Sequence, residues 1–276
     1  MSKPQIVVIP GAWHGPSYMD AVSSKLEKLG YTIHARQMPA VGASNPPKDL
    51  SEDVAVARSL VEEAIGSGND VIAIVHSWGG IVAGTGFVGL GKKEREAEGK
   101  KGGLIRVGYL AAFIVPEGVS LLDAIGGSPP PWFDIQVRYQ VLSFCITIPL
   151  KKRNGTRNMK VTERVVQEPF VYAKDPAVFY NDLPTSDQQA YYSKLQSQTF
   201  ATFLDKTKHA SWRQIPSSYW VCEDDQAIPA FAQDAMIQGV KEAGAEIEVQ
   251  RIKASHSPFL SRPDETVEWI VSVAKA

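Results

Sequence analysis

The feature that most constrains the fold is the alternation of short apolar strands with amphipathic helices along most of the chain. Apolar runs at 5–10 and 71–75 are each followed by segments whose apolar residues recur at helical spacing. Continuous apolar strands joined through helices are typical of parallel sheets that helices cover on both faces. The sequence therefore predicts an α/β fold with a mostly parallel, doubly wound sheet. Strands are expected at 5–10, 31–38, 71–75, 104–112, 218–222 and 246–252, and helices at 16–29, from Asp49 to Ile65, and at 78–90, 229–243 and 263–275.

The alternation stops for about a hundred residues in the second half of the chain. Between Glu117 and Pro216, residues 126–131 form a Gly/Ser/Pro-rich turn and the rest mixes aromatic residues with polar ones. An insertion between core strands at the carboxyl edge of a parallel sheet lies over the expected ligand crevice. We therefore expect residues 1–117 and 216–276 to form the core, and 118–215 to form a helical cap inserted between core strands.

Composition limits the classes of partner. The 276 residues include 29 basic and 30 acidic side chains, a net charge of -1, so there is no overall electrostatic reason to expect nucleic acid. The uncharged stretch 71–91 could mimic a membrane span, but it contains His76, Ser77 and six glycines, and is better explained by a buried strand that runs into a close-packed helix. Two cysteines, Cys145 and Cys222, form neither a disulfide framework nor a zinc-ligand spacing. We expect a cytoplasmic protein with no metal or other cofactor and no nucleic-acid or membrane partner; a homodimer is left open.

Two charged stretches are expected to be solvated surface. Residues 91–103 hold eight charges in thirteen positions, together with four glycines. Residues 151–164 carry six basic residues, which would attract anionic substrates if they faced a site, although a solvated face is the simpler reading.

The most informative motif is residues 75–80, Val-His-Ser-Trp-Gly-Gly. Ser77 lies between an apolar strand and a helix, with glycines two and three residues later. A sharp turn of this kind lifts a serine hydroxyl out of the sheet, and it needs small neighbours where strand and helix nearly touch. The motif therefore predicts a nucleophile elbow, with Val75 in place of the usual first glycine.

A serine hydroxyl needs a base and an acid, and in this architecture both follow the serine along the chain. His256 comes just after the last predicted strand, at the carboxyl edge, whereas His209 lies beside lysines and suggests a surface position. Three acidic residues, 223–225, directly follow the strand at 218–222. We expect Asp225 to orient His256, with Asp224 as the first alternative and Glu117, after an earlier strand, as the second.

An oxyanion needs backbone donors. We expect the N–H of Trp78, directly after the nucleophile, and the N–H of Ala12, in the Gly-rich loop after the first strand. An aromatic pocket is expected around these donors. The residues proposed to line it are Trp13, His14, Phe113, Trp132 and Phe133.

These motifs together resemble the α/β-hydrolase superfamily over essentially the whole chain, and within it the branch of plant methylesterases, hydroxynitrile lyases and related microbial hydrolases. The segments that carry the resemblance are 10–15, 76–80, 179–184, 215–219, 225–229 and 256–260. Pro10 stands where that branch usually has a histidine before the glycine. The hydrogen bond by which that histidine would support the loop is therefore not expected here, whereas the Ala12 donor still is. In the lyases, a threonine and a lysine occupy the positions of Gly11 and Ser257 here, so the lyase reaction is disfavoured.

The resemblance and the motifs imply a serine hydrolase that cleaves a small, apolar or aromatic carboxylic ester through an acyl-enzyme. Lactone opening, carbon–carbon bond hydrolysis and acyl transfer would use the same three side chains and remain alternatives. A non-catalytic ligand-binding relative is a further one.

Overall fold

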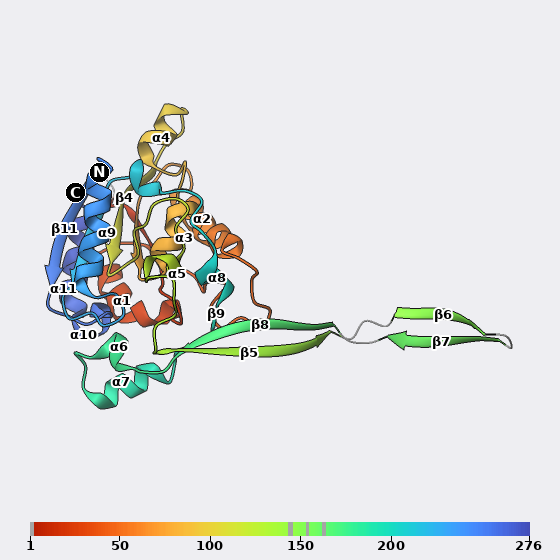
Figure 1. Ribbon diagram of the computed structural model, residues 1–276. Coiled ribbons are helices and arrows are strands. Elements are labelled where there is room, and N and C mark those ends of the chain that lie inside the picture. The colour runs from red at the N-terminus through yellow and green to blue at the C-terminus, as the bar shows by residue number, and fades with distance from the viewer. Residues whose placement is uncertain (1–2, 143–145, 153–154, 162–163) are drawn as a thin grey trace.

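The computed structural model describes residues 3–142, 146–152, 155–161 and 164–276 (Figure 1). Cys145 and the side chains of the basic stretch 151–164 lie outside the described part. Among the helices in these ranges, none combines the length and the apolarity that crossing a bilayer requires.

A six-stranded sheet forms the centre of the molecule. Its order is β11-β10-β4-β3-β1-β2, and every neighbouring pair is parallel. The strands are β1 (Gln5–Ile9), β2 (Ile33–Ala35), β3 (Asp70–His76), β4 (Gly103–Leu110), β10 (Ser217–Cys222) and β11 (Ile247–Ile252). The chain passes from β1 outward to β2 and returns to the other side of β1 as β3. The loops that follow β1 and β3 therefore diverge, which opens a crevice at this edge of the sheet.

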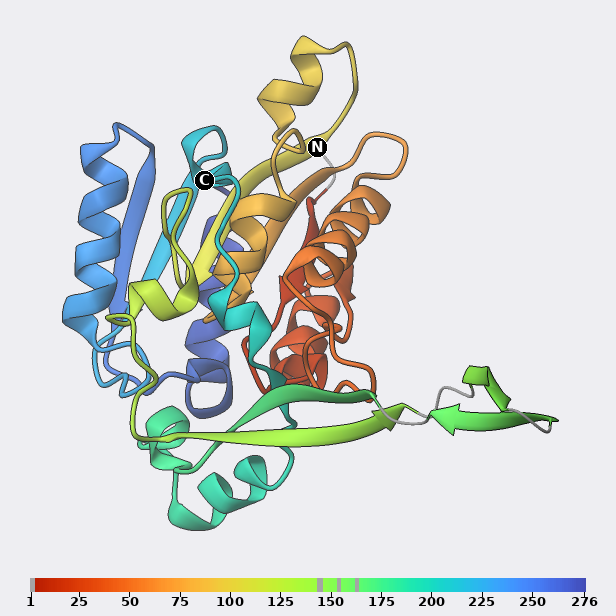
Figure 2. The same cartoon turned by 45° about the vertical axis from the view of Figure 1, so that its right-hand side comes forward.

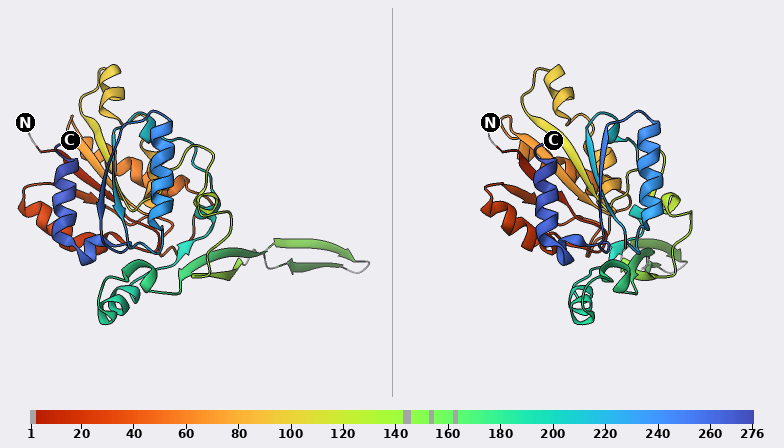
Figure 3. Two further views of the ribbon diagram at one scale, coloured as in Figure 1. Left: turned by 60° about the vertical axis from the view of Figure 1, so that its left-hand side comes forward. Right: turned by 90° about the vertical axis from the view of Figure 1, so that its left-hand side faces the viewer.

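Helices cover both faces of the sheet, so the predicted doubly wound arrangement is confirmed. Helices α1 (Asp20–Lys28) and α11 (Pro263–Val273) pack together on one face, and α2 (Ser51–Ile65), α3 (Gly79–Gly86) and α9 (Ala230–Glu242) lie on the other (Figure 3). Shorter elements are η1 (Pro16–Met19), α4 (Lys92–Ala97), η2 (Ser211–Arg213) and α10 (Pro258–Ser261).

Helix boundaries differ from the sequence expectation at three places. The helix expected from residue 16 begins as the 3₁₀ turn η1, and the helix expected at 78–90 ends at Gly86. Asp49 accepts a hydrogen bond from the Ser51 N–H (2.8 Å), but α2 starts after Leu50, later than the expected start at Asp49.

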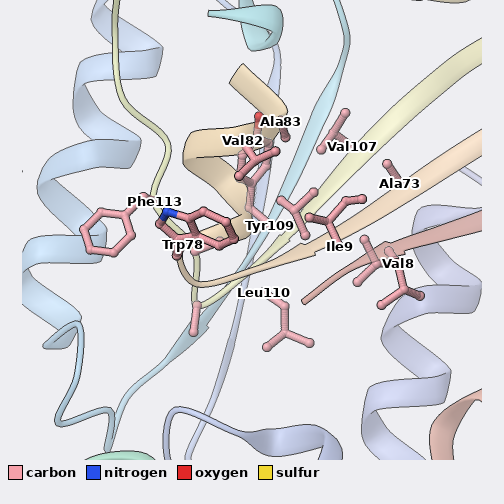
Figure 4. Close-up of a cluster of buried hydrophobic side chains, with 14 of the residues drawn as sticks. Val8, Ile9, Ala73, Trp78, Val82, Ala83, Val107, Tyr109, Leu110 and Phe113 are labelled. Carbon is pink, nitrogen blue, oxygen red and sulfur yellow. The ribbon is translucent and has the colours of Figure 1, made fainter. Parts of the chain in front are cut away.

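The core fixes the strands that carry the crevice. Figure 4 shows side chains of β1, β3 and β4, such as Ile9, Ala73 and Val107, gathered with Val82 of α3 in one buried cluster. At the other end of the sheet, Trp220 of β10 stacks on Trp269 of α11, with ring centroids 5.2 Å apart. Such interdigitated packing resists displacement, so the loops at the strand ends start from a rigid base.

The segment inserted between β4 and β10 crosses the carboxyl edge of the sheet (Figures 1 and 2). The expectation of a helical cap is wrong in part, because its longest elements are antiparallel strands. Phe133, Ile135 and Val137 alternate with polar residues, a period of two that favours a strand over a helix. The strands are β5 (Phe133–Leu142), β8 (Arg164–Ala173) and β9 (Gln198–Thr199), with a separate pair β6 (Ile146–Lys152) and β7 (Gly155–Val161); the helices are α5 (Leu121–Ala124), α6 (Ala177–Tyr180), α7 (Thr185–Tyr192) and α8 (Ala201–Leu204). The exact division at 117/118 and 215/216 stays a prediction.

Candidate active site

Ser77 lies at a strained turn between β3 and α3. Its φ angle is 53°, in the left-handed region that non-glycine residues rarely adopt. Neighbouring glycines allow the turn: a Cβ on Gly79 would be 2.8 Å from the Pro10 carbonyl oxygen, and one on Gly80 would overlap the Phe113 carbonyl. The Phe113 N–H also donates to the Ser77 carbonyl (3.0 Å). The structure thus holds Ser77 in the conformation that an elbow requires.

The loop after β1 is tied to the inserted segment through Trp13. This residue also has a positive φ, 64°. Its indole Nε1 donates to the Val171 carbonyl of β8 (2.8 Å), and its own carbonyl accepts from the Gln196 N–H (3.0 Å). Because Trp13 follows Ala12 directly, these bonds fix the backbone that carries the Ala12 N–H.

Asp225 and His256 form a buried pair at the carboxyl edge. His256 is 1% exposed and Asp225 5%, and the Nδ1 of His256 lies 2.7 Å from an Asp225 carboxylate oxygen. The other Asp225 oxygen accepts from the backbone N–H groups of Ala227 and Ile228, each at 2.8 Å. A carboxylate can only accept, so Nδ1 carries the hydrogen, and neutral His256 has its lone pair on Nε2. The pair therefore presents a base.

Gln233 of α9 supports the acid and was not identified from the sequence. It is fully buried, and its amide nitrogen lies 3.3 Å from Asp225 and 2.7 Å from the Ile228 carbonyl. Its amide oxygen accepts from the Cys222 N–H (3.2 Å). The signal was available: Gln233 shares the buried stripe of α9 with Ile237 and Val240. A polar side chain in a buried stripe usually satisfies a specific partner.

The inserted segment also holds the loops that carry the acid and the histidine. Asp182 accepts hydrogen bonds from the Ser255 N–H (3.0 Å) and the Ser261 hydroxyl (2.6 Å). The side chain of the neighbouring Asn181 donates to the Asp224 carbonyl (3.0 Å). Residues 181 and 182 thus connect the insertion to both loops, a role that the sequence motif did not reveal.

Two further histidines are structural. The Nε2–H of His76 donates to the His256 carbonyl (2.9 Å), and burial holds the pKa of His76 well below its usual value. His14 donates from Nδ1 to the Ala12 carbonyl and accepts from the Tyr180 hydroxyl, both at 2.7 Å. Burial lowers the pKa of His14 to about 3, so its ring stays neutral and rigidly oriented.

A cavity of about 340 Å³ opens onto Ser77. Ala12 and Trp78 lie on its wall, with Trp13, Phe113, Trp132, Phe133 and Phe179. His14 is not on this wall, which corrects its expected place in the pocket: its ring points behind the loop toward Tyr180. Apart from the tryptophans, the described lining has polar side chains only at Ser77 and Gln226. The cavity therefore suits an apolar or aromatic group.

The alternative acidic residues and His209 lie on the surface, outside the buried pair. Asp224 is exposed, and Glu117 is engaged on the surface by Arg213 (3.1 Å), so neither lies against His256. His209 is also exposed. Among the described residues, no three His, Cys, Asp or Glu side chains are placed to share a metal ion.

Comparison with known proteins agrees with this architecture. The model of the alpha/beta hydrolase family matches residues 6–269. The alpha/beta hydrolase nvfD of Aspergillus novofumigatus is 30% identical over 274 residues, which cover 99% of this chain and 98% of that protein. Similar solved structures include polyneuridine aldehyde esterase (TM-score 0.69, 16% identity, 99% of this chain and 100% of that one) and a pyrethroid hydrolase from Sphingobium faniae (TM-score 0.68, 21% identity, 100% and 98%). With the family match spanning the sheet, the elbow and the histidine loop, the chain belongs to the alpha/beta hydrolase family.

Proposed function

We propose that this protein is a serine hydrolase that cleaves a carboxylic ester with an apolar or aromatic group. One observation carries the proposal: a strained Ser77, on the wall of an apolar cavity, and a buried Asp225–His256 pair follow parallel strands at the same edge of the sheet. The name of the similar polyneuridine aldehyde esterase is consistent with ester chemistry.

In this reaction the Ser77 hydroxyl attacks the ester carbonyl carbon, and His256 Nε2 accepts the hydroxyl proton. The N–H groups of Ala12 and Trp78 donate to the oxyanion that forms. As the tetrahedral intermediate collapses, the carbon–oxygen bond to the alcohol breaks and His256 returns the proton to the leaving oxygen. Asp225 stabilises the imidazolium between these two transfers.

Water then attacks the acyl-enzyme by the same steps. His256 Nε2 takes a proton from the water, the oxyanion forms at the same two donors, and collapse releases the acid and regenerates the Ser77 hydroxyl. The apolar walls hold the substrate but supply no charge, so rate enhancement rests on the serine, the pair and the two N–H donors.

A fluorophosphonate probe tests the nucleophile. We expect the probe to label the wild type at Ser77, and Ser77→Ala to remove both the label and the hydrolysis of short aryl esters. Ser186→Ala, at an exposed serine of α7, is the matched control and should keep both. Labelling that persists in Ser77→Ala would overturn the assignment.

Lactones and esters require the same attack, so product analysis by mass spectrometry over a panel of both substrate types separates them. The same panel includes an acyl acceptor other than water, which reports acyl transfer, and a 1,3-diketone, which reports carbon–carbon bond hydrolysis because its second carbonyl stabilises the carbanion that leaves.

A further inference from the structure

A second cavity lies beside the one that opens onto Ser77. Its volume is about 500 Å³, and it runs between α9 and the segment that follows β4, residues 114–119. These two segments lie alongside each other (Figure 2). The two cavities have four lining residues in common, namely Ala124, Phe231, Ala232 and Met236. The second cavity is therefore continuous in its walls with the candidate active site.

The walls of this second cavity are almost entirely apolar. Val115 and Trp212 line one side, and Met236 and Val240 of α9 line the other. Among the described lining residues, Arg213 has the one charged side chain.

Arg213 does not make this an anion site. Its guanidinium forms hydrogen bonds to both carboxylate oxygens of Glu117 (3.1 and 3.2 Å) and lies over the Trp212 ring, 4.5 Å from the centroid. Its charge is thus already compensated, and an anionic group beside Arg213 would compete with Glu117. The chemistry of the walls instead favours an uncharged hydrocarbon chain or ring.

Phe231 stands where the two cavities meet. Its side chain is 77% exposed, the largest exposed fraction among the large hydrophobic residues described, although it lines both cavities. A ligand that extended from one cavity into the other would cover this ring and remove its apolar surface from water.

We propose that the second cavity is a subsite for one elongated apolar arm of the ester substrate, while the ester group itself lies at Ser77. This inference rests on the proposed function and narrows the substrate class to esters that carry a long hydrocarbon or multi-ring arm. Phe231 and Met236, which line both cavities, would limit the width of the passage between the cavity at Ser77 and the second cavity.

Gly239 offers a clean way to block this subsite. It lines the second cavity and not the first, and a Cβ built on it meets nothing within 4 Å. Gly239→Phe therefore adds a ring to the cavity without a clash at its Cβ, while Gly239→Ala is the matched control for the change of helix propensity.

The experiment measures kcat/KM for two series of uncharged esters, one with a lengthening acyl chain and one with a lengthening alcohol. In one series we expect Gly239→Phe to lower kcat/KM for long members roughly fourfold for each methylene that loses burial, mainly through KM, and to leave the shortest ester unchanged. Gln238→Phe places the same ring at an exposed position of α9 that lines neither cavity, and it should match the wild type throughout. The series that responds tells which side of the ester occupies the subsite.

A binding measurement separates the subsite from the chemistry. In a Ser77→Ala background, calorimetry with the longest and shortest ester of each series reports affinity without turnover. Weaker binding of a long ester in Gly239→Phe would support the subsite, whether or not the wild type hydrolyses esters. Failure of the wild type to hydrolyse any ester would refute the proposed function and leave the subsite standing. Unchanged binding and unchanged length dependence in Gly239→Phe would overturn the subsite and leave the cavity to another occupant, such as a protein partner.

Discussion

Asparagine at position 225 tests how the histidine is held. The two Asp225 oxygens have different tasks: one accepts from the Ala227 and Ile228 N–H groups, and the other accepts from His256 Nδ1 and Gln233. Asparagine has only one acceptor oxygen, so in Asp225→Asn that oxygen can accept either from the two backbone N–H groups or from His256, but not from both. Turning its oxygen toward His256 would leave two buried N–H donors facing an NH₂ group, at roughly 1–3 kcal/mol for each unsatisfied donor.

The amide oxygen should therefore stay with the backbone donors, and the NH₂ group should face His256. His256 can then pair with it only by accepting at Nδ1, which moves the imidazole hydrogen to Nε2 and removes the base. By analogy with the handling of this tautomer in serine proteases, we expect kcat to fall about 10⁴-fold, or about 5.5 kcal/mol of transition-state stabilisation.

Steady-state hydrolysis of a short ester measures this effect, and chemical denaturation checks that the variant remains folded. Asp224→Asn is the matched control because the Asp224 side chain is exposed, and it should keep near-wild-type kcat. If Asp225→Asn kept more than about a tenth of the wild-type kcat, the tautomer argument would be refuted.

Two further predictions concern stability. Gly80→Ala should destabilise the fold by several kcal/mol, on the order of a strongly overpacked core site, because its Cβ would overlap the Phe113 carbonyl; the same replacement at Gly239 meets nothing and should not, so equal urea midpoints for the two variants would contradict the packing argument. Burial raises the pKa of Asp53 to about 7 from its usual 3.8, so the folded state binds a proton that the unfolded state has lost, and stability falls as pH rises between these two values. Asp53→Asn can keep the bond from the Ala40 N–H, and the wild type should lose roughly 3 kcal/mol relative to it between pH 5 and pH 8; parallel pH profiles in urea unfolding would refute this.

Local signals in the sequence predicted the parts of the fold that depend on local periodicity. The strands of the core sheet and the turn at Ser77 could be inferred because the patterns that mark them are only a few residues long. These patterns are β-branched runs, apolar stripes at helical spacing and the glycines after Ser77. The same reasoning placed Asp225 and His256 at one sheet edge, since parallel strands end together. The structure brings these two side chains within 2.7 Å.

Contacts between distant segments could not be predicted in the same way. Asp182 meets Ser255 across 73 positions of sequence, and neither residue carries a period or spacing that identifies the other. The position of His14 was misjudged for a related reason. A histidine beside a predicted oxyanion donor can point into the pocket or behind the loop, and the bond to the Tyr180 hydroxyl of the inserted segment favours the second.

The bonds of Asn181 and Asp182 bear on how enzymes of this architecture could be recombined. Because the inserted segment carries the acceptor for Ser255 and the donor for the Asp224 carbonyl, a chimera that exchanged the whole segment for that of a relative would also exchange part of the scaffold of the histidine loop. Transplants that retain residues 181 and 182 should tolerate a new pocket lining better than complete ones. New substrate ranges in this lineage would then arise more readily by changes within α5 and the cavity-lining residues of 125–133 than by wholesale replacement of the insertion.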